Sequence, residues 1–152
     1  MIYFAAAMKT NTSNIEHLVT IKVSAIKVYD ALTTPEGLSE IWTTELSVKP
    51  QIDFINEFTF DKDTDKMRIT ELQPGKKVAW LVIESDPEWV GTVISFELSE
   101  KNNLTTVVLK QLGWKEVSDF YRFCNYHWGW FLYSLKHYCE NGEGFPYQRR
   151  TF

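Results

Sequence analysis

The pattern of hydrophobic and polar residues changes its period three times along the chain. Over residues 15–23 apolar and polar side chains alternate, which predicts a first β-strand. Ser24 is a suitable N-cap for a short helix over residues 25–33. The pair Thr34-Pro35 is typical of a helix start, and we expect a second short helix that reaches Trp42. Two brief helices should therefore follow the first strand.

The middle of the chain alternates with a period of two residues and predicts antiparallel strands. Turn-forming residues separate the alternating stretches, most clearly at Gln73-Pro-Gly-Lys76 and Glu100-Lys-Asn-Asn103. No strand is followed by a helix long enough for a parallel crossover, so a doubly wound sheet is not expected. The strands are expected at residues 57–61, 66–72, 77–83, 92–99 and 105–112.

The last long segment, residues 117–140, has helical periodicity. Ser118 is a suitable N-cap, and Asn141-Gly142 is a typical helix stop. The apolar side chains fall on a stripe about 120° wide, the width of a helix face that packs on a core, so we expect this helix to lie on the sheet. The stripe holds Tyr121, Cys124, Trp128, Phe131, Leu132, Leu135, Tyr138 and Cys139.

Composition then narrows the class of protein. A chain of 152 residues with 44% hydrophobic and 24% charged residues is long enough for one domain with its own core, so neither a metal nor a disulfide is needed to hold it together. The net charge of −4 lacks the basic excess that nucleic-acid binding requires. No run approaches the roughly 20 apolar residues that span a bilayer, and no basic region precedes the apolar start as in a secretory signal. We expect a cytoplasmic protein without a nucleic-acid or membrane partner.

The expected domain organisation is simple. Residues 1–14 form an N-terminal extension, residues 15–147 form a single domain, and residues 148–152 form a short tail to which the sequence assigns no task. Met8 precedes a polar stretch and is an alternative start to Met1.

Four stretches of the chain, in this order and spacing, resemble a known family. They are Val23-Ser-Ala-Ile-Lys-Val-Tyr-Asp-Ala-Leu-Thr-Thr-Pro-Glu-Gly-Leu38 with Trp42, Ile69-Thr-Glu-Leu-Gln-Pro-Gly-Lys-Lys-Val-Ala-Trp80, Thr106-Val-Val-Leu-Lys-Gln-Leu-Gly-Trp114, and Trp128-Gly-Trp-Phe-Leu-Tyr-Ser-Leu-Lys-His-Tyr-Cys-Glu-Asn-Gly142. The chain resembles the START-like (SRPBCC) superfamily, and within it the activator of heat-shock protein 90 ATPase homologue-1-like family.

The resemblance implies an α+β helix-grip fold, in which a curved antiparallel sheet wraps around the long C-terminal helix. It also implies a cavity between sheet and helix that often accepts an apolar or amphipathic small molecule. It does not imply one shared reaction, because members of one fold differ in function.

The residue types that usually carry cofactor or redox chemistry are few. Cys124 and Cys139 lie about 22 Å apart on one helix and cannot form a disulfide with each other, so we interpret them as buried thiols. His17, His127 and His137 do not share a face, which argues against a metal site. No phosphate-binding loop or nucleophile elbow is present, so no cofactor, metal or catalytic residue is assigned.

Two polar side chains remain as candidates for chemistry in a cavity. Glu71 shares a strand face with Met67 and Ile69 and is the one candidate acid or base, although a solvent-exposed position is the favoured interpretation. Gln111 is expected on a buried strand face, where its amide needs hydrogen bonds from the backbone or water, or from the polar end of a ligand.

Aromatic residues make up 15% of the chain, and we expect some of them to form the wall of a cavity. Trp42, Trp80 and Trp128 are placed inward by the period and either fill the core or line the cavity. The residues expected to bind a ligand are Trp42, Phe58, Met67, Trp80, Gln111, Trp128, Phe131 and Leu132.

A second aromatic group, Tyr126, Trp130 and Tyr133, occupies the opposite side of the last helix. Because exposed aromatic clusters are usually covered, we expect either loops or, by preference, a homodimer contact there. The leading hypothesis is a noncatalytic module that binds a hydrophobic small molecule. The alternatives are a co-chaperone-like domain that contacts a chaperone, and an enzyme similar to the polyketide cyclases and aromatases.

Overall fold

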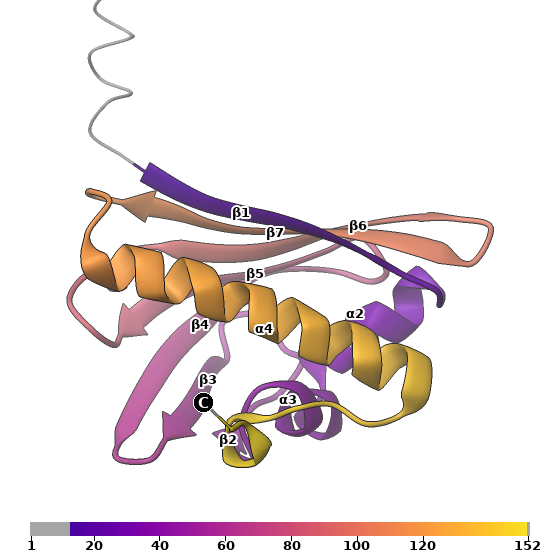
Figure 1. Ribbon diagram of the computed structural model, residues 1–152, viewed down its shortest axis with the longest axis horizontal. Helices are drawn as coiled ribbons and strands as arrows, with labels where there is room; N and C mark the ends of the chain where they lie inside the picture. Colours follow the sequence, from indigo (N-terminus) through magenta and orange to yellow (C-terminus); the bar gives the residue numbers. More distant parts are fainter. Residues whose placement is uncertain (1–12, 152) are drawn as a thin grey trace, which may run out of the picture.

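A seven-stranded antiparallel sheet curves around one long helix (Figure 1). The structure is a computed structural model that describes residues 13–151. The strand order is β1-β7-β6-β5-β4-β3-β2, so the first and seventh strands are neighbours. The strands are β1 (Ser13–Ile21), β2 (Glu45–Ser47), β3 (Ile55–Phe60), β4 (Asp63–Gln73), β5 (Lys77–Glu84), β6 (Val93–Lys101) and β7 (Leu104–Trp114).

The helices begin and end at the residues that the sequence marks. They are α2 (Ala25–Thr33), α3 (Pro35–Ile41), α4 (Asp119–Asn141) and the 3-10 helix η1 (Tyr147–Arg149). The predicted N-caps Ser24, Thr34 and Ser118 each accept a hydrogen bond from the backbone N–H three residues ahead, and Gly142 ends α4 with a left-handed φ of 85°. The predicted helix-grip fold is confirmed, with two short helices after β1 and a long helix on the sheet.

The ends of the chain depart from the expected organisation. β1 begins at Ser13, inside the expected N-terminal extension, of which residues 1–12 lie outside the described part of the chain. At the other end, residues 148–150 are hydrogen-bonded to the domain. Arg149 pairs with Glu40 and Glu143 at 3.0 Å each, and Gln148 Nε2 donates to Thr43 Oγ1. The tail therefore packs against the junction after α3, and it forms part of the site described below.

Aromatic rings fill the space between the sheet and α4. Trp42, just after α3, lies 4.5 Å from Phe58 of β3 and stacks on Trp80 of β5 at 6.1 Å between ring centroids. Phe96 of β6 stacks on Phe131 of α4 at 5.6 Å. All of these rings are buried, so the centre of the half-barrel is a packed core.

Two local features were not predicted. β2 has only three residues, too few for an alternating pattern to be recognised, and it is held by pairing with β3. In β4 the register shifts between Ile69 and Glu71, so the simple alternation that put Glu71 on the apolar face is wrong there. The Glu71 carboxylate is one-third exposed, and it pairs with Lys77 at 3.3 Å.

Gly37 of α3 lies where α2 and α3 pack closely, whereas Gly129 of α4 lies in open space. A Cβ on Gly37 would lie 2.3 Å from the Ala31 carbonyl oxygen, whereas a Cβ on Gly129 of α4 would have no neighbour within 4 Å. We predict that Gly37→Ala lowers the free energy of unfolding by about 1–3 kcal/mol because the two helices must move apart. Gly129→Ala should raise it by roughly 0.5–1 kcal/mol through helix propensity. Urea unfolding measures both, and a neutral Gly37→Ala would contradict the close approach.

Candidate functional site

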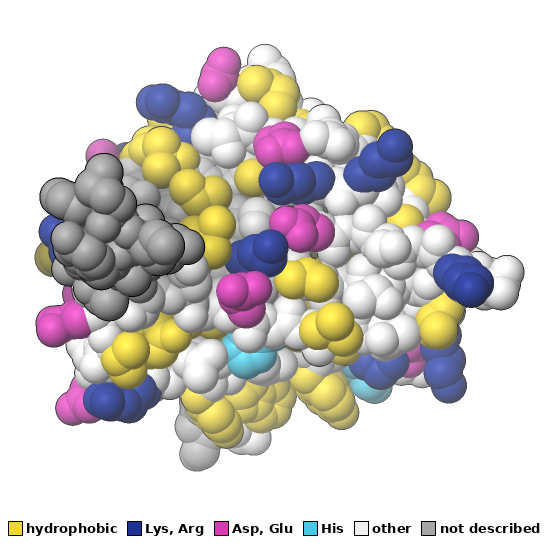
Figure 2. All heavy atoms as spheres, turned by 90° about the horizontal axis from the view of Figure 1, so that it is seen from above, with side chains coloured by type: hydrophobic (Ala, Val, Ile, Leu, Met, Phe, Trp, Pro, Cys, Tyr) yellow, Lys and Arg dark blue, Asp and Glu magenta, His cyan; other side chains and the backbone are white. Residues whose placement is uncertain are grey.

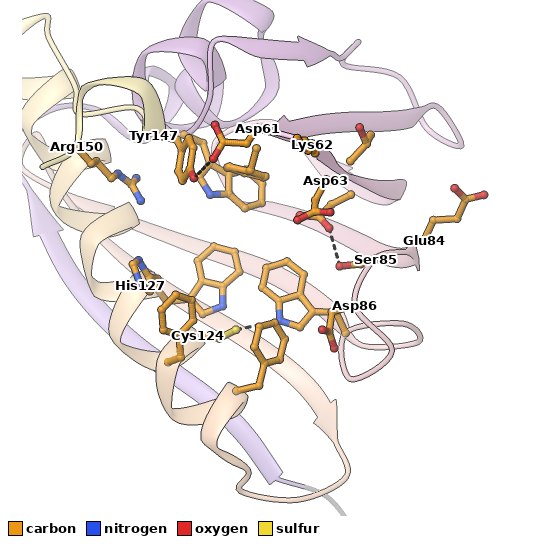
Figure 3. Close-up of a pocket in the computed structure, with 18 residues that line it drawn as sticks. Asp61, Lys62, Asp63, Glu84, Ser85, Asp86, Cys124, His127, Tyr147 and Arg150 are labelled. Atoms are coloured by element: carbon orange, nitrogen blue, oxygen red, sulfur yellow. Dashed lines mark hydrogen bonds between the residues drawn. The ribbon is translucent and has the colours of Figure 1, made fainter. Parts of the chain in front are cut away.

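An open groove of about 1240 Å³ lies at one end of the half-barrel (Figure 3). Its walls come from the β3–β4 turn, the β5–β6 loop, the first half of α4 and the C-terminal segment. The lining residues are Trp42, Phe60, Asp61, Lys62, Asp63, Thr64, Asp65, Glu84, Ser85, Asp86, Trp89, Phe120, Phe123, Cys124, His127, Trp128, Tyr147 and Arg150. One side is thus aromatic and another carries several carboxylates.

Stacked indoles form the apolar wall of the groove. Trp89 of the β5–β6 loop and Trp128 of α4 lie 5.8 Å apart with ring planes only 10° from parallel. Trp42 is 5.6 Å from Trp128 and continues the wall toward the core. The exposed fractions of these rings are small, 9% for Trp89, 3% for Trp128 and 6% for Trp42, so only a small part of each indole faces the groove. Trp89 and Trp128 form the base of this apolar wall, and we call the two residues the indole floor.

A chain of buried hydrogen bonds fixes the indole floor. Trp128 Nε1 donates to Gln111 Oε1 at 2.8 Å, and Gln111 Nε2 donates to Thr92 Oγ1 at 3.0 Å. Thr92 Oγ1 in turn donates to the Trp89 carbonyl at 2.6 Å. An indole nitrogen can only donate, so the amide oxygen of Gln111 must face Trp128. These hydrogen bonds connect the Trp128 indole, through Gln111 of β7 and Thr92 just before β6, to the backbone of Trp89.

Two side chains form the hydrogen bonds that the buried amide of Gln111 needs. Gln111 is completely buried, as alternation in β7 predicts. The amide nitrogen donates to Thr92 and the amide oxygen accepts from Trp128, so both polar ends of Gln111 have side-chain partners. Gln111 therefore acts from beneath the groove and positions the indole floor.

Carboxylates gather on the opposite rim. Asp65 of β4 accepts a hydrogen bond from Ser85 Oγ at 2.7 Å, and Asp61 accepts one from the Tyr147 hydroxyl at 2.6 Å. Burial raises the pKa of Asp65, and the charges of Asp63 and Asp86 raise it further, while the Ser85 hydrogen bond lowers it. The rim is therefore a place where negative charge is already crowded.

Arg150 and His127 lie at the other end of the groove, and Arg150 is engaged with the protein. Its Nε donates to the Phe145 carbonyl at 2.8 Å, and its guanidinium lies 5.8 Å from the centre of the Trp130 ring. Burial, helped by the positive charge of Arg150, lowers the pKa of His127, so its imidazole is neutral at pH 7.

Cys124 lies next to Trp89 of the indole floor, and its thiol is unreactive. Its side chain is buried, and Sγ accepts a hydrogen bond from Trp89 Nε1 at 3.3 Å. Burial raises the pKa of the Cys124 thiol to about 12, and that of Cys139 likewise. Because the thiolate is the nucleophile, Cys124 serves here as a small apolar side chain.

The residues expected to bind a ligand divide into two groups. Trp42 and Trp128 line the groove. The six others are not among the lining residues: they are buried beneath the groove, in the core or in the hydrogen-bond chain. These are Phe58, Met67, Trp80, Gln111, Phe131 and Leu132.

Sequence reasoning missed the acidic rim, Trp89 and the C-terminal wall. The rim is visible in the sequence as Asp61-Lys-Asp-Thr-Asp65 and Ser85-Asp86, but such stretches are also ordinary turns. Only the pairing of β3, β4 and β5 brings the two stretches together.

A curved antiparallel sheet that grips a C-terminal helix, with a groove at its open end, defines a START-like protein. The family model described as Activator of Hsp90 ATPase homolog 1-like protein matches residues 22–140. The chain belongs to this family. No curated protein matches the chain.

Solved structures agree with this assignment. The Aha1 dimer from Colwellia psychrerythraea is 38% identical, with a TM-score of 0.81, and the match covers 87% of this chain and 99% of that chain. Protein MLL2253 from Mesorhizobium loti is 19% identical, with a TM-score of 0.75 over 86% of this chain and 99% of that one. DynU16, from the dynemicin biosynthetic locus, is 18% identical, with a TM-score of 0.72 over 86% of this chain and 48% of that one. The latter two likenesses show the fold alone.

Two other kinds of site are absent from the described residues. Within residues 13–151, no helix has the length and apolar character needed to cross a bilayer. In the same part of the chain, no three His, Cys, Asp or Glu side chains are grouped as ligands of a metal ion.

The raised pKa of Asp65 leads to a test by pH. A carboxyl whose pKa is higher in the folded state stabilises the fold while it is protonated, and this contribution is lost as the pH rises through the folded pKa. We predict that Asp65→Asn, which keeps an acceptor for Ser85, raises the melting temperature at pH 7. The gain should shrink at acidic pH, below the raised pKa of Asp65, where the wild-type carboxyl is itself protonated.

Calorimetry of the wild type and Asp65→Asn at pH 7 and at acidic pH measures this difference. The matched control is Asp30→Asn. Asp30 is an exposed residue of α2, and its side chain has no hydrogen bond among the described residues. A lower melting temperature for Asp65→Asn at pH 7 would show that Asp65 is a favourable charge in the fold.

Proposed function

We propose that the protein is a noncatalytic binding module that holds an amphipathic small molecule in the groove. The observation that carries the proposal is the indole floor, two stacked rings at the base of an open groove that are held in place from below. Binding sites of this kind combine apolar walls with a few placed polar groups. The rim carboxylates and Ser85 would supply the polar contacts.

The chemistry of the lining residues favours binding over catalysis. Cys124 is a protonated, buried thiol, and His127 is neutral but lies beside Arg150. Glu71, the acid or base candidate for a cyclase-like enzyme, is not among the lining residues and is paired with Lys77. The enzyme alternative therefore loses the residue on which it rested.

Phe123 offers a test that leaves the core intact. It lines the groove but is 58% exposed, so its removal should not disturb folding. We predict that the neutral fluorescent naphthalene dye prodan binds the wild type saturably with a blue-shifted emission. Phe123→Ala should weaken this binding roughly fivefold, because an aromatic contact is lost.

Tyr126→Ala is the control, since Tyr126 is on the same helix, 64% exposed and not a lining residue. Its affinity for prodan should equal that of the wild type. The proposal fails if the wild type shows no saturable binding, or if the two variants weaken it equally.

A protein-binding face along α4 is a second candidate function, because aromatic side chains follow the outer side of that helix. Tyr126 and Tyr133 are 64% and 54% exposed. The C-terminal segment covers part of this face, since Phe145 stacks on Tyr133 at 5.6 Å and Arg150 lies over Trp130. In Figure 2, hydrophobic side chains project along the edge where Figure 1 places α4.

A second copy of the chain is the favoured occupant of this face, since the Colwellia psychrerythraea structure at 38% identity is a dimer. We predict a mass near twice 17.8 kDa by light scattering for the wild type. The double variant Tyr126→Ser/Tyr133→Ser should run as a monomer. Leu18→Ser, which removes an exposed apolar side chain from edge strand β1, should leave the dimer intact. A monomeric wild type, or a dimer lost only with Leu18→Ser, would contradict this assignment.

The family description makes a chaperone ATPase the other partner to test. If α4 contacts a chaperone, the wild type should raise the ATPase rate of purified Hsp90, and Tyr126→Ser/Tyr133→Ser should not. No effect of the wild type would remove this partner.

A further inference from the structure

We propose that the groove selects an amphipathic organic cation: an apolar ring body on the indole floor, with its ammonium group among the rim carboxylates. This inference rests on the proposed binding function and names the ligand class. It starts from the asymmetry of the groove, whose apolar wall and charged rim face the same space (Figure 3).

The rim carries carboxylates that the protein leaves without a counter-charge. Five acidic residues line the groove, and one of them, Glu84, is paired with Lys66 at 3.3 Å. Among the described residues, no ion pair involves the other four, Asp61, Asp63, Asp65 and Asp86. A bound cation would supply the missing charge in a partly desolvated place, where attraction is stronger than in water.

Three of these carboxylates interact electrostatically, although they come from two segments: Asp63 and Asp65 from β4, and Asp86 from the β5–β6 loop. Asp63 and Asp86 both raise the pKa of Asp65, as does its own burial. Asp65 and Asp86 also act on Cys124, at the foot of the indole floor. The negative field therefore extends from the rim to the apolar wall.

The groove offers little to an anion. Arg150 already donates to the Phe145 carbonyl and lies over Trp130, and His127 is neutral at pH 7. Lys62, the other basic lining residue, is exposed on the β3–β4 turn. Lys62 stands between Asp61 and Asp63, so an anionic ligand that approached it would also meet these carboxylates.

The indole floor decides between a metal ion and an organic cation. The described carboxylates are not grouped as metal ligands, and a bare ion would leave the aromatic wall unused. An ammonium group attached to a ring body uses both halves of the groove, because indole faces attract cations and also stack on apolar rings.

Three naphthalene compounds of one shape but different charge test the inference by titration calorimetry. They are 2-naphthylmethylammonium, 2-naphthylmethanol and 2-naphthoate. We expect the ammonium compound to bind roughly tenfold more tightly than the alcohol at low salt, and the naphthoate to bind most weakly. The preference should fall at high salt, because the rim is partly exposed.

Charge removal at the rim is the second arm. Asp65→Asn and Asp86→Asn each keep the hydrogen-bond acceptor that the structure uses, for Ser85 Oγ and the Glu88 N–H. The double variant should bind the ammonium compound no better than the alcohol. Asp30→Asn should behave as the wild type.

The outcomes separate this inference from the proposed function. If none of the three compounds binds, the proposed binding function fails and the inference with it. If the alcohol binds as tightly as the ammonium compound, or the naphthoate binds most tightly, the groove binds ligands but the cation preference is wrong. Retention of the preference in the double variant would likewise overturn the inference.

Discussion

The position of one buried amide governs the site. Gln111 lies completely buried in β7, and both of its polar ends are occupied by side chains, Thr92 from the end of the β5–β6 loop and Trp128 from α4. Removing the amide would leave the Trp128 N–H buried without an acceptor, at a cost of about 1–3 kcal/mol. The amide therefore ties α4 to the sheet at a fixed height, and the stacking of Trp89 on Trp128 follows from that height. The same hydrogen bonds hold α4 over the packed core and fix the floor of the open groove.

The C-terminal wall of the groove depends on a second close approach. Ser134 Oγ of α4 donates to the Ile41 carbonyl at 2.8 Å and accepts from the Phe145 N–H at 2.7 Å, and the Tyr147 N–H donates to the Trp42 carbonyl at 2.7 Å. Gly144 is needed because a Cβ there would lie 2.4 Å from the Glu40 carbonyl oxygen. The segment that follows α4 is thereby held where Tyr147 and Arg150 line the groove, with the Tyr147 hydroxyl hydrogen-bonded to Asp61 of the rim.

The fold could be predicted from the sequence because its signals are local. Ser24, Thr34 and Ser118 mark helix starts by their own hydrogen bonds, and Gly142 marks a stop by its backbone conformation. Gln111 was placed correctly on a buried face by alternation in β7. The groove is different in kind, because Asp65 and Asp86 are brought together only by strand pairing. A bulge in β4 overturned the alternation that put Glu71 on the apolar face, while its favoured solvent-exposed position agrees with the structure. Periodicity tells which residues are buried, but it cannot tell which buried rings border an open space.

The indole N–H signals of a ¹⁵N-labelled sample titrated with prodan test the central claim most directly. Trp89 and Trp128 line the groove, whereas Trp114 is buried between Phe120 and Tyr121 and is not a lining residue. A ligand on the indole floor should shift the Trp89 and Trp128 signals together and leave that of Trp114 in place. Unchanged Trp89 and Trp128 signals in the presence of bound dye would contradict the account.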